Sequence, residues 1–227
     1  PNSHSKLTLQ THTRLSITTR LYNYLNKEKG QRICLDISEQ ACEQAPRNFF
    51  LTLLSNMLTT VGDTLSNPKT VLTWVMSYVG APVSLISLIV PVRESGSMLP
   101  QIFLSYYVRT KSVRKWIWVF GSLAQSAAVM GIGYIALNFQ GATAGWLMIV
   151  CLIFFSLARA FCSLTSKDVL GKTIPKTRRG KLKGYTVAVS GVLVTASGII
   201  VAYRTQVEQD IWFYAGIIFF AASLWIL

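Results

Sequence analysis

The sequence predicts an all-α protein that crosses a membrane six times. Of its 227 residues, 51% are hydrophobic and only 14% are charged, and the mean hydropathy is +0.41. Soluble domains carry about 25% charged residues, so this composition is typical of a membrane protein. Lysine and arginine concentrate in every second connection between the apolar segments. Short loops rich in these residues stay in the cytoplasm, which predicts a multi-pass protein with a cytoplasmic N-terminus.

Two connections hold much of the positive charge. Arg109–Lys115 is one, and Lys167–Lys183, with seven lysines and arginines, is the other. On a soluble domain, a net charge of +13 would suggest nucleic-acid binding. Here the basic residues flank apolar segments, so anionic lipid headgroups are the expected counter-ions. We therefore expect the lipid bilayer, and no nucleic acid, as a partner.

Residues 1–47 are polar and contain no stretch long enough to cross a bilayer. We interpret them as a cytoplasmic N-terminal tail, which either contains a short amphipathic helix around Leu21–Ile33 or is a poorly ordered extension. Its two cysteines, Cys34 and Cys42, lack the spacing and the histidine neighbours of a zinc site. From the cysteines of this chain we expect neither a metal site nor a disulfide.

The transmembrane domain is expected to cover residues 48–227, and its last four spans are clear. They are Trp116–Asn138, Trp146–Ser166, Tyr185–Tyr203 and Ile211–Leu227. Each is apolar for close to the length that crosses a bilayer, roughly 20 residues at 1.5 Å per residue. We expect the sixth helix to be truncated by the end of the sequence. No segment has the features of a signal peptide.

The stretch before these spans can be divided in two ways. Hydropathy alone marks Asn48–Leu65 and Val71–Val92 and leaves Ser97–Val108 as a stub. This division would place the charged residues of the second span at the membrane edge.

The spacing of polar residues favours a different division. Two continuous polar stripes, from Thr52 to Thr73 and from Ser84 to Ser105, recur every three or four positions. Two long helices, Asn48–Tyr78 and Pro82–Val108, keep both stripes unbroken. Gly80-Ala81-Pro82 then forms the turn between them. We adopt this division, which places the charged residues near mid-membrane.

The charged residues within the predicted spans that we take as candidates are Asp63, Arg93, Glu94 and Arg159. A charge at the bilayer centre costs at least a few kcal/mol, so each is a candidate for transport or proton coupling. Glu94 lies on the polar stripe and is the foremost candidate for a proton carrier or a substrate counter-charge. Arg93 points about 100° away, and either pairs with Glu94 or pairs elsewhere in the bundle. The alternative is a purely structural ion pair.

The other candidates have equally plausible structural roles. Asp63 lies shortly before a proline where we expect a helix irregularity, so capping or packing is as plausible as transport. Arg159 lies toward the cytoplasmic end of its helix, where its side chain could snorkel. Thr59 on the first stripe, and Ser87 and Gln101 on the second, are candidates for lining a substrate path. A polar stripe in a membrane must face protein or water.

Nothing in the sequence points to an enzyme. It contains no paired carboxylates in a soluble pocket, no nucleophile beside a base and no cluster of metal ligands. Gly171-Lys172-Thr173 resembles the end of a phosphate-binding loop, but Ser166 stands where the first glycine belongs and no strand precedes it. We expect no enzymatic activity, no cofactor and no bound metal.

Several short motifs carry a family resemblance. Gly62-Asp63 is followed by a proline, and Gly80-Ala81-Pro82 precedes the second helix. A further set lies after the fourth helix: Asp168, Ile174-Pro175, Arg179-Gly180 and Gly184. With Arg159 in the fourth helix, these motifs make Asn48–Leu227 resemble the N-terminal six-helix half of a major facilitator superfamily transporter.

The resemblance implies two inverted three-helix repeats, and twelve helices in two halves for the whole protein, with the substrate path between the halves. The C-terminal six-helix half would then be a partner, and a bacterial inner (plasma) membrane the location. In some members the arginine that matches Arg159 is tied to proton movement. The resemblance also makes the basic connections candidates for cytoplasmic gating: Lys111, Arg114, Lys115, Asp168, Arg178 and Arg179.

The sequence departs from the family at two places. Thr110 and Val113 stand where the connection after the second helix usually has aspartate and glycine. The fifth helix lacks the Gly-Pro pair of drug/proton antiporters, which counts against that subclass.

We predict secondary active transport of a small solute by alternating access, either proton-coupled or as a uniporter. One alternative is a protein of this fold that has lost transport and serves as a membrane sensor or scaffold. Its polar stripes would face other helices with no open cavity. The other is the membrane domain of an ATP-driven exporter, which needs long cytoplasmic helix extensions that these short connections do not accommodate.

Overall fold

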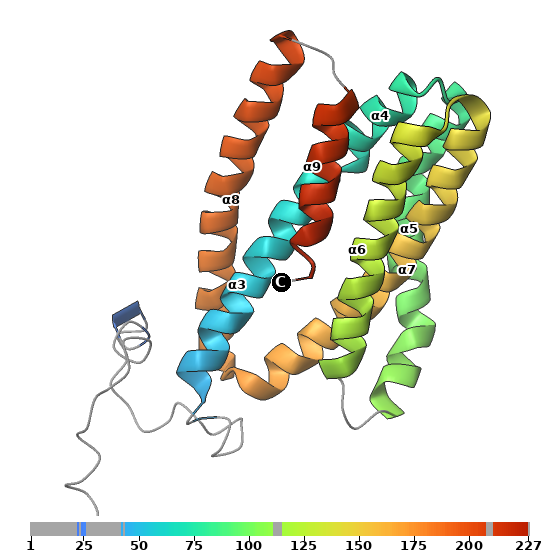
Figure 1. Ribbon diagram of the computed structural model, residues 1–227. Coiled ribbons are helices and arrows are strands. Elements are labelled where there is room, and N and C mark those ends of the chain that lie inside the picture. Colours follow the sequence, from blue (N-terminus) through green and yellow to red (C-terminus); the bar gives the residue numbers. More distant parts are fainter. Residues whose placement is uncertain are drawn as a thin grey trace, which may run out of the picture.

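The computed structural model describes residues 22, 24–25, 42, 44–110, 115–207 and 211–226, and this part of the chain is helical without a strand (Figure 1). Its elements are α3 (Ala45–Leu65), the π-helix η1 (Pro68–Leu72), α4 (Thr73–Tyr78), α5 (Val83–Thr110), α6 (Lys115–Asn138), α7 (Gly141–Thr173), α8 (Lys176–Val207) and α9 (Ile211–Ser223). Three helices, α6, α7 and α8, contain segments long and apolar enough to cross a bilayer, and α9 is a shorter apolar helix. The prediction of an α-helical membrane protein is thus confirmed at this coarser level.

The first predicted helix is broken into three pieces. Pro68 has no N–H to donate, so the α3 helix cannot continue through it, and α3 ends at Leu65. The side chain of Asn67 accepts a 2.8 Å hydrogen bond from the N–H of Lys69 and caps the next turn. The prediction of one continuous helix over Asn48–Tyr78 is therefore wrong at residues 66–67. The irregularity expected near the proline lies at this position.

The second predicted helix and the turn before it are close to expectation. Gly80 has φ +75°, a conformation that glycine adopts at no steric cost, and α5 then runs unbroken from Val83 to Thr110. Gly141, with φ +68°, begins α7 in the same way. Its N–H donates a 2.6 Å hydrogen bond to the carbonyl oxygen of Val79, which ties the two turns together at one end of the bundle.

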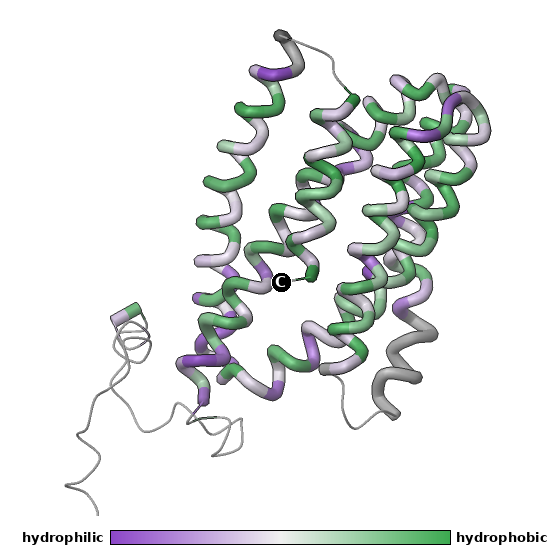
Figure 2. The backbone as a smooth tube through the Cα atoms, viewed as in Figure 1, coloured by the Kyte–Doolittle hydropathy of each residue, from purple (hydrophilic) through white to green (hydrophobic). Residues whose placement is uncertain are grey.

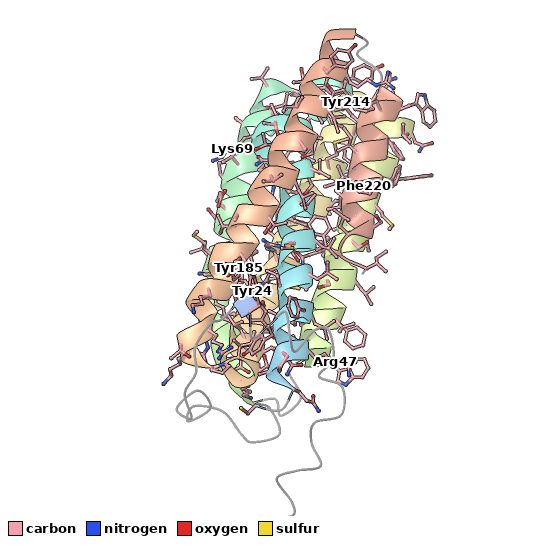
Figure 3. All side chains as sticks on the ribbon, turned by 90° about the vertical axis from the view of Figure 1, so that its left-hand side faces the viewer. Tyr24, Arg47, Lys69, Tyr185, Tyr214 and Phe220 are labelled. Atoms are coloured by element: carbon pink, nitrogen blue, oxygen red, sulfur yellow. The ribbon has the colours of Figure 1, made fainter. Side chains whose placement is uncertain are left out.

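The opposite end of the bundle carries the positive charge. α5 and α7 end there, α6 and α8 begin there, and the start of α3 lies beside them (Figure 1). Figure 3 shows Arg47, Tyr24 and Tyr185 toward this end and Tyr214 toward the other. Lys167–Lys183 is not a loop as predicted, because α7 continues to Thr173 and α8 starts at Lys176. Only Ile174 and Pro175 connect them.

The main hydrophobic core lies between α4, α5, α6, α7 and α9. Ile89, Val75, Ile132, Met148 and Ile218 are among its fully buried members. α6 packs against both α7 and α9, while α5 packs along α7. Ser126 of α6 donates a 2.8 Å hydrogen bond to the Ala222 carbonyl oxygen of α9. In a membrane, such close packing and interhelical hydrogen bonds hold helices together.

α8 stands apart from this core. It packs mainly against α3, and Figure 1 shows it at the side of the bundle away from α5 and α7. Large apolar residues such as Val187, Val192 and Ile199 are exposed on α8. Hydrophilic residues gather where α3 and α8 meet at the basic end (Figure 2).

Little of the predicted N-terminal tail is described. The helix predicted around Leu21–Ile33 falls mostly on residues outside the described part. Cys42 is disulfide-bonded, so the expectation of no disulfide is wrong, and Cys34 lies outside the described residues. Cys151 and Cys162 are free thiols in α7, as expected.

Candidate ionic site between α3, α5 and α7

Three charged side chains from three helices meet within the bundle. The carboxylate of Asp63 in α3 pairs through Oδ1 with Nη2 of Arg93 in α5, at 3.4 Å. Its other oxygen, Oδ2, accepts a hydrogen bond from Nη2 of Arg159 in α7. The sequence marked all three residues as candidates, but it did not predict which would pair. Of the two options for Arg93, pairing with Glu94 or pairing elsewhere in the bundle, the structure shows the second, because Arg93 pairs with Asp63.

Two further contacts hold the guanidinium group of Arg93. Its Nη1 donates a 3.1 Å hydrogen bond to the carbonyl oxygen of Ser66. That carbonyl is available because Pro68 interrupts the helix and leaves the last carbonyls of α3 without helical partners. The face of the guanidinium lies over the ring of Phe155, 5.2 Å from its centroid. The helix break therefore contributes directly to the site.

Close approach of α5 and α7 brings the two arginines to the same carboxylate. A Cβ atom added to Gly96 would lie 2.9 Å from Cβ of Ser156, closer than side chains pack. Ser156 is fully buried, and its hydroxyl donates a 2.8 Å hydrogen bond to the Leu152 carbonyl oxygen within α7. Gly96 follows Arg93 by about one turn and Ser156 precedes Arg159 by about one turn.

A cavity of about 310 Å³ opens beside the three charges. Asp63, Arg93 and Arg159 have 20%, 15% and 30% of their side-chain surface exposed, so they are partly desolvated and still reachable. Two further charged residues line the cavity, Lys69 and Glu94, and both are exposed. The other lining residues are Thr60, Thr64, Asn67, Pro68, Ser97, Phe155 and Ser156. We call this space the ionic cavity.

A second cavity, of about 400 Å³, lies along the half of α3 nearer the basic end. Thr52, Ser55 and Thr59 of α3 line it, and no charged residue is among the described residues that do so. We call it the neutral cavity. The polar stripe that the sequence predicted is thus shared between two cavities: its first part faces the neutral cavity and Asp63 faces the ionic one.

An aromatic pair lies between the two cavities. Phe155 lines the ionic cavity and Trp225 lines the neutral one, and their rings meet edge to face with centroids 5.6 Å apart. A Cβ atom on Gly62 would lie 3.1 Å from the Trp225 ring, so the absence of a side chain at Gly62 lets the indole pack closely against α3. Neither Phe155 nor Trp225 could be identified from the sequence, because each is one aromatic residue within a long apolar helix or segment.

The remaining candidates of the membrane region lie outside the ion cluster. Glu94 is on the wall of the ionic cavity, and no ion pair of Glu94 occurs within the described residues. Thr59 lines the neutral cavity. Ser87 is exposed, and neither it nor Gln101 lines either cavity.

Three of the candidates for cytoplasmic gating, Asp168, Arg178 and Arg179, make structural contacts. Arg179 donates to the carbonyl oxygens of Ile174 (2.9 Å) and Gly171 (2.7 Å), so it caps the end of α7 and fixes the connection to α8. Asp168 pairs with Lys172 at 3.4 Å within α7. Lys111 and Arg114 lie outside the described residues, and Lys115 begins α6 without a described side chain.

Arg178 belongs to a buried cluster at the same end. Its guanidinium lies over the ring of Tyr22, 4.6 Å from the centroid, and Tyr22 contacts Phe49 edge to face. Ile174 and Leu182 complete the cluster with Ala45. Burial raises the pKa of the Tyr22 hydroxyl above its ordinary value, and the positive charge of Arg178 opposes this shift. The cluster attaches part of the N-terminal tail to the basic end of α3 and α8.

No protein-family model matches this chain, and neither a curated protein nor a solved structure is similar enough to it to count as a match.

Proposed function

We propose that the chain is a six-helix unit of a secondary transporter of the major facilitator type, which moves a small solute by alternating access. The observation that carries the proposal is that the polar stripe on α3 faces cavities. Its residues line two open cavities within an otherwise apolar bundle. A sensor or scaffold that had lost transport was expected to bury this stripe against other helices.

The pairing of the helices supports the inverted-repeat part of the proposal. Number the spans one to six, with α3, η1 and α4 as span one and α5 to α9 as spans two to six. Exchanging one with four, two with five and three with six converts the α3–α8 contact into the α7–α5 contact. The same exchange converts α3–α9 into α7–α6 and leaves α3–α7 and α6–α9 unchanged. Two related three-helix units would produce this pattern. The contacts of α5 with η1 and α4 are the exception, because α8 and α7 do not pack against each other to the same extent.

The ion cluster supplies a means of coupling. Asp63 is shared by two arginines on different helices, so a proton on its carboxylate would weaken both ion pairs at once. Release of α5 and α7 from α3 would then change the relative positions of the three helices around the ionic cavity. We propose Asp63 as the coupling residue, with Arg93 and Arg159 as its two partners.

The orientation belongs to the same proposal. The basic ends of the helices and the N-terminal tail would lie in the cytoplasm, in a bacterial inner membrane, because lysine and arginine are retained on that side. The exposed apolar face of α8 would then contact lipid or the second six-helix unit.

Solute-driven proton movement tests the proposal. The chain, expressed with the second six-helix unit that the proposal assigns to it, is reconstituted into vesicles that contain a pH-sensitive dye. Sugars, amino acids and organic acids are then added under an inward proton gradient. We expect one solute class to accelerate internal acidification, and Asp63→Asn to abolish the acceleration. Acidification by a solute that persists in Asp63→Asn would contradict the role of Asp63. Absence of acidification for all classes would contradict proton-coupled transport, and absence of radiolabelled solute uptake in the same vesicles would contradict transport.

A further inference from the structure

The charges that line the ionic cavity do not balance. Lys69, Arg93 and Arg159 contribute three positive charges, and Asp63 and Glu94 contribute two negative ones, an excess of +1. An uncompensated charge between membrane helices is expensive, because the surrounding lipid cannot solvate it. Asp63 is shared by two arginines, and Glu94 on the cavity wall compensates one further positive charge, so a single positive charge remains without a partner of opposite sign.

The unused donors belong to Arg159. Arg93 uses Nη1 on the Ser66 carbonyl oxygen, Nη2 on Asp63, and its face on Phe155. Arg159, in contrast, makes a hydrogen bond through Nη2 alone among the described residues, and 30% of its side chain is exposed. Its Nε and Nη1 therefore have no hydrogen-bond partner among the described residues, and Arg159 lines the cavity. Each of these groups can donate a charge-assisted hydrogen bond to an oxygen of a carboxylate or phosphate group.

The rest of the lining suits a small anion. Thr60, Thr64, Asn67 and Ser97 are neutral side chains with hydroxyl or amide groups that can donate hydrogen bonds. Lys69 is exposed on the cavity wall, where its charge attracts anions toward the opening. The volume of about 310 Å³ is at the lower end of the range for ligand pockets.

We infer that the ionic cavity binds a small organic anion, whose carboxylate or phosphate group is held by Arg159 and drawn in by Lys69. This inference rests on the proposed function only in that the bound anion is the transported solute. The anion completes the charge balance of the cavity while Asp63 keeps its two ion pairs.

The electrostatic part is tested with charged thiol reagents of similar size. Thr64→Cys places a thiol in the ionic cavity and Ser55→Cys places one on the same helix in the neutral cavity. Both are made in a background whose native cysteines are serine. Rates are measured with anionic sulfonatoethyl and cationic trimethylammoniumethyl methanethiosulfonate, each divided by its rate with a free thiol. We expect the anionic reagent to be favoured at least fivefold at Thr64→Cys and less than twofold at Ser55→Cys. Equal preference at both sites would overturn the inference.

Protection by ligands tests binding itself. Succinate and inorganic phosphate should slow the modification of Thr64→Cys in a saturable manner, while succinamide, the neutral analogue of succinate, should not. Neither anion should protect Ser55→Cys. Protection by succinate alone assigns a carboxylate ligand, and protection by phosphate alone assigns a phosphate ligand. Absence of protection by both would overturn the inference.

Two variants assign the effect to the named residues. Arg159→Gln should weaken protection at least tenfold, and Lys69→Gln, an exposed residue whose replacement leaves the helix packing intact, should weaken it severalfold. Lys183→Gln, an exposed cation of α8 at the basic end, should have no effect. Protection that Arg159→Gln and Lys69→Gln both retain would contradict the inference.

These measurements need no transport, so the two proposals fail separately. Anion protection in a protein that shows no solute flux would contradict the transporter and preserve the anion site. Flux of a neutral or cationic solute without anion protection would support the transporter and contradict the anion site.

Discussion

At the scale of single residues, the main feature of the candidate site is the carboxylate of Asp63, which pairs with two arginines. The sequence identified Asp63, Arg93 and Arg159, because charges in apolar helices are rare and costly. It favoured Glu94 over Asp63 as the proton carrier, on the basis of the polar stripe. The structure instead places Asp63 between the guanidinium groups and leaves Glu94 exposed on the cavity wall. A stripe on one helix says nothing about which residues of other helices lie opposite it.

The different surroundings of the two carboxylates lead to the first prediction. Asp63→Asn leaves two guanidinium groups without their counter-charge and should destabilise the protein by about 1–3 kcal/mol, less than for a fully buried pair because the groups are partly solvated. Proton-coupled uptake should be lost. Glu94→Gln removes the same charge from an exposed position and should retain both stability and uptake. Thermal unfolding in detergent and the dye assay measure the two effects, and equal losses in both variants would contradict the assignment.

At the scale of elements, the predicted helices are largely present but their boundaries differ. The turn at Gly80 was predictable because a glycine and a proline two positions apart, Gly80 and Pro82, are typical of a break between helices. The break before Pro68 was expected only as an irregularity, since the polar stripe continues through it in sequence. The end of α7 was missed because its charged residues resemble a loop, whereas Arg179 and the Asp168–Lys172 pair stabilise helix ends there.

The close contact of α5 and α7 leads to the second prediction. Gly96→Ala adds a Cβ atom where only 2.9 Å separates it from Ser156, in a contact between two packed helices. Overpacking of this kind costs about 1–3 kcal/mol. It should also separate Arg93 from Arg159 and reduce uptake. Gly216→Ala is the matched control, because its added Cβ would have no neighbour within 4 Å. Similar unfolding temperatures for Gly96→Ala and the parent protein would contradict the packing argument.

The connection between α7 and α8 leads to the third prediction. Arg179→Ala removes the two hydrogen bonds that cap α7 and should lower stability by about 1–2 kcal/mol. Lys183→Ala, an exposed neighbour on α8, should have an effect below about 0.5 kcal/mol. If the two variants unfold at the same temperature, Arg179 does not stabilise the connection.

At the scale of the whole molecule, the charge pattern predicted an arrangement that single elements could not. The alternation of basic connections placed both basic segments on one side of the membrane, and the structure brings their helix ends to one end of the bundle (Figure 1). The interhelical pairings and the two cavities could not be predicted, because they depend on contacts such as Gly96–Ser156 and Phe155–Trp225 between distant parts of the chain.

The fourth prediction concerns the orientation of the bundle. Lys176 lies at the basic end, at the start of α8, so Lys176→Cys should react with an impermeant thiol reagent in inside-out membrane vesicles and not in intact cells. Thr143→Cys, at the opposite end near the start of α7, should show the reverse pattern. Reaction of Lys176→Cys from outside intact cells would invert the proposed topology.

Alternating access is the central claim, and the side from which the ionic cavity can be reached tests it most directly. Thr64→Cys, free of other cysteines, is prepared in right-side-out and in inside-out vesicles with the second six-helix unit present, and an impermeant anionic thiol reagent is added to each. A transporter that alternates between two open states should expose this thiol to both sides in turn. We therefore predict modification in both vesicle orientations, and loss of reactivity in both when succinate or phosphate saturates the site. Modification from one orientation alone would contradict alternating access and would favour a static scaffold with a cavity open to one side.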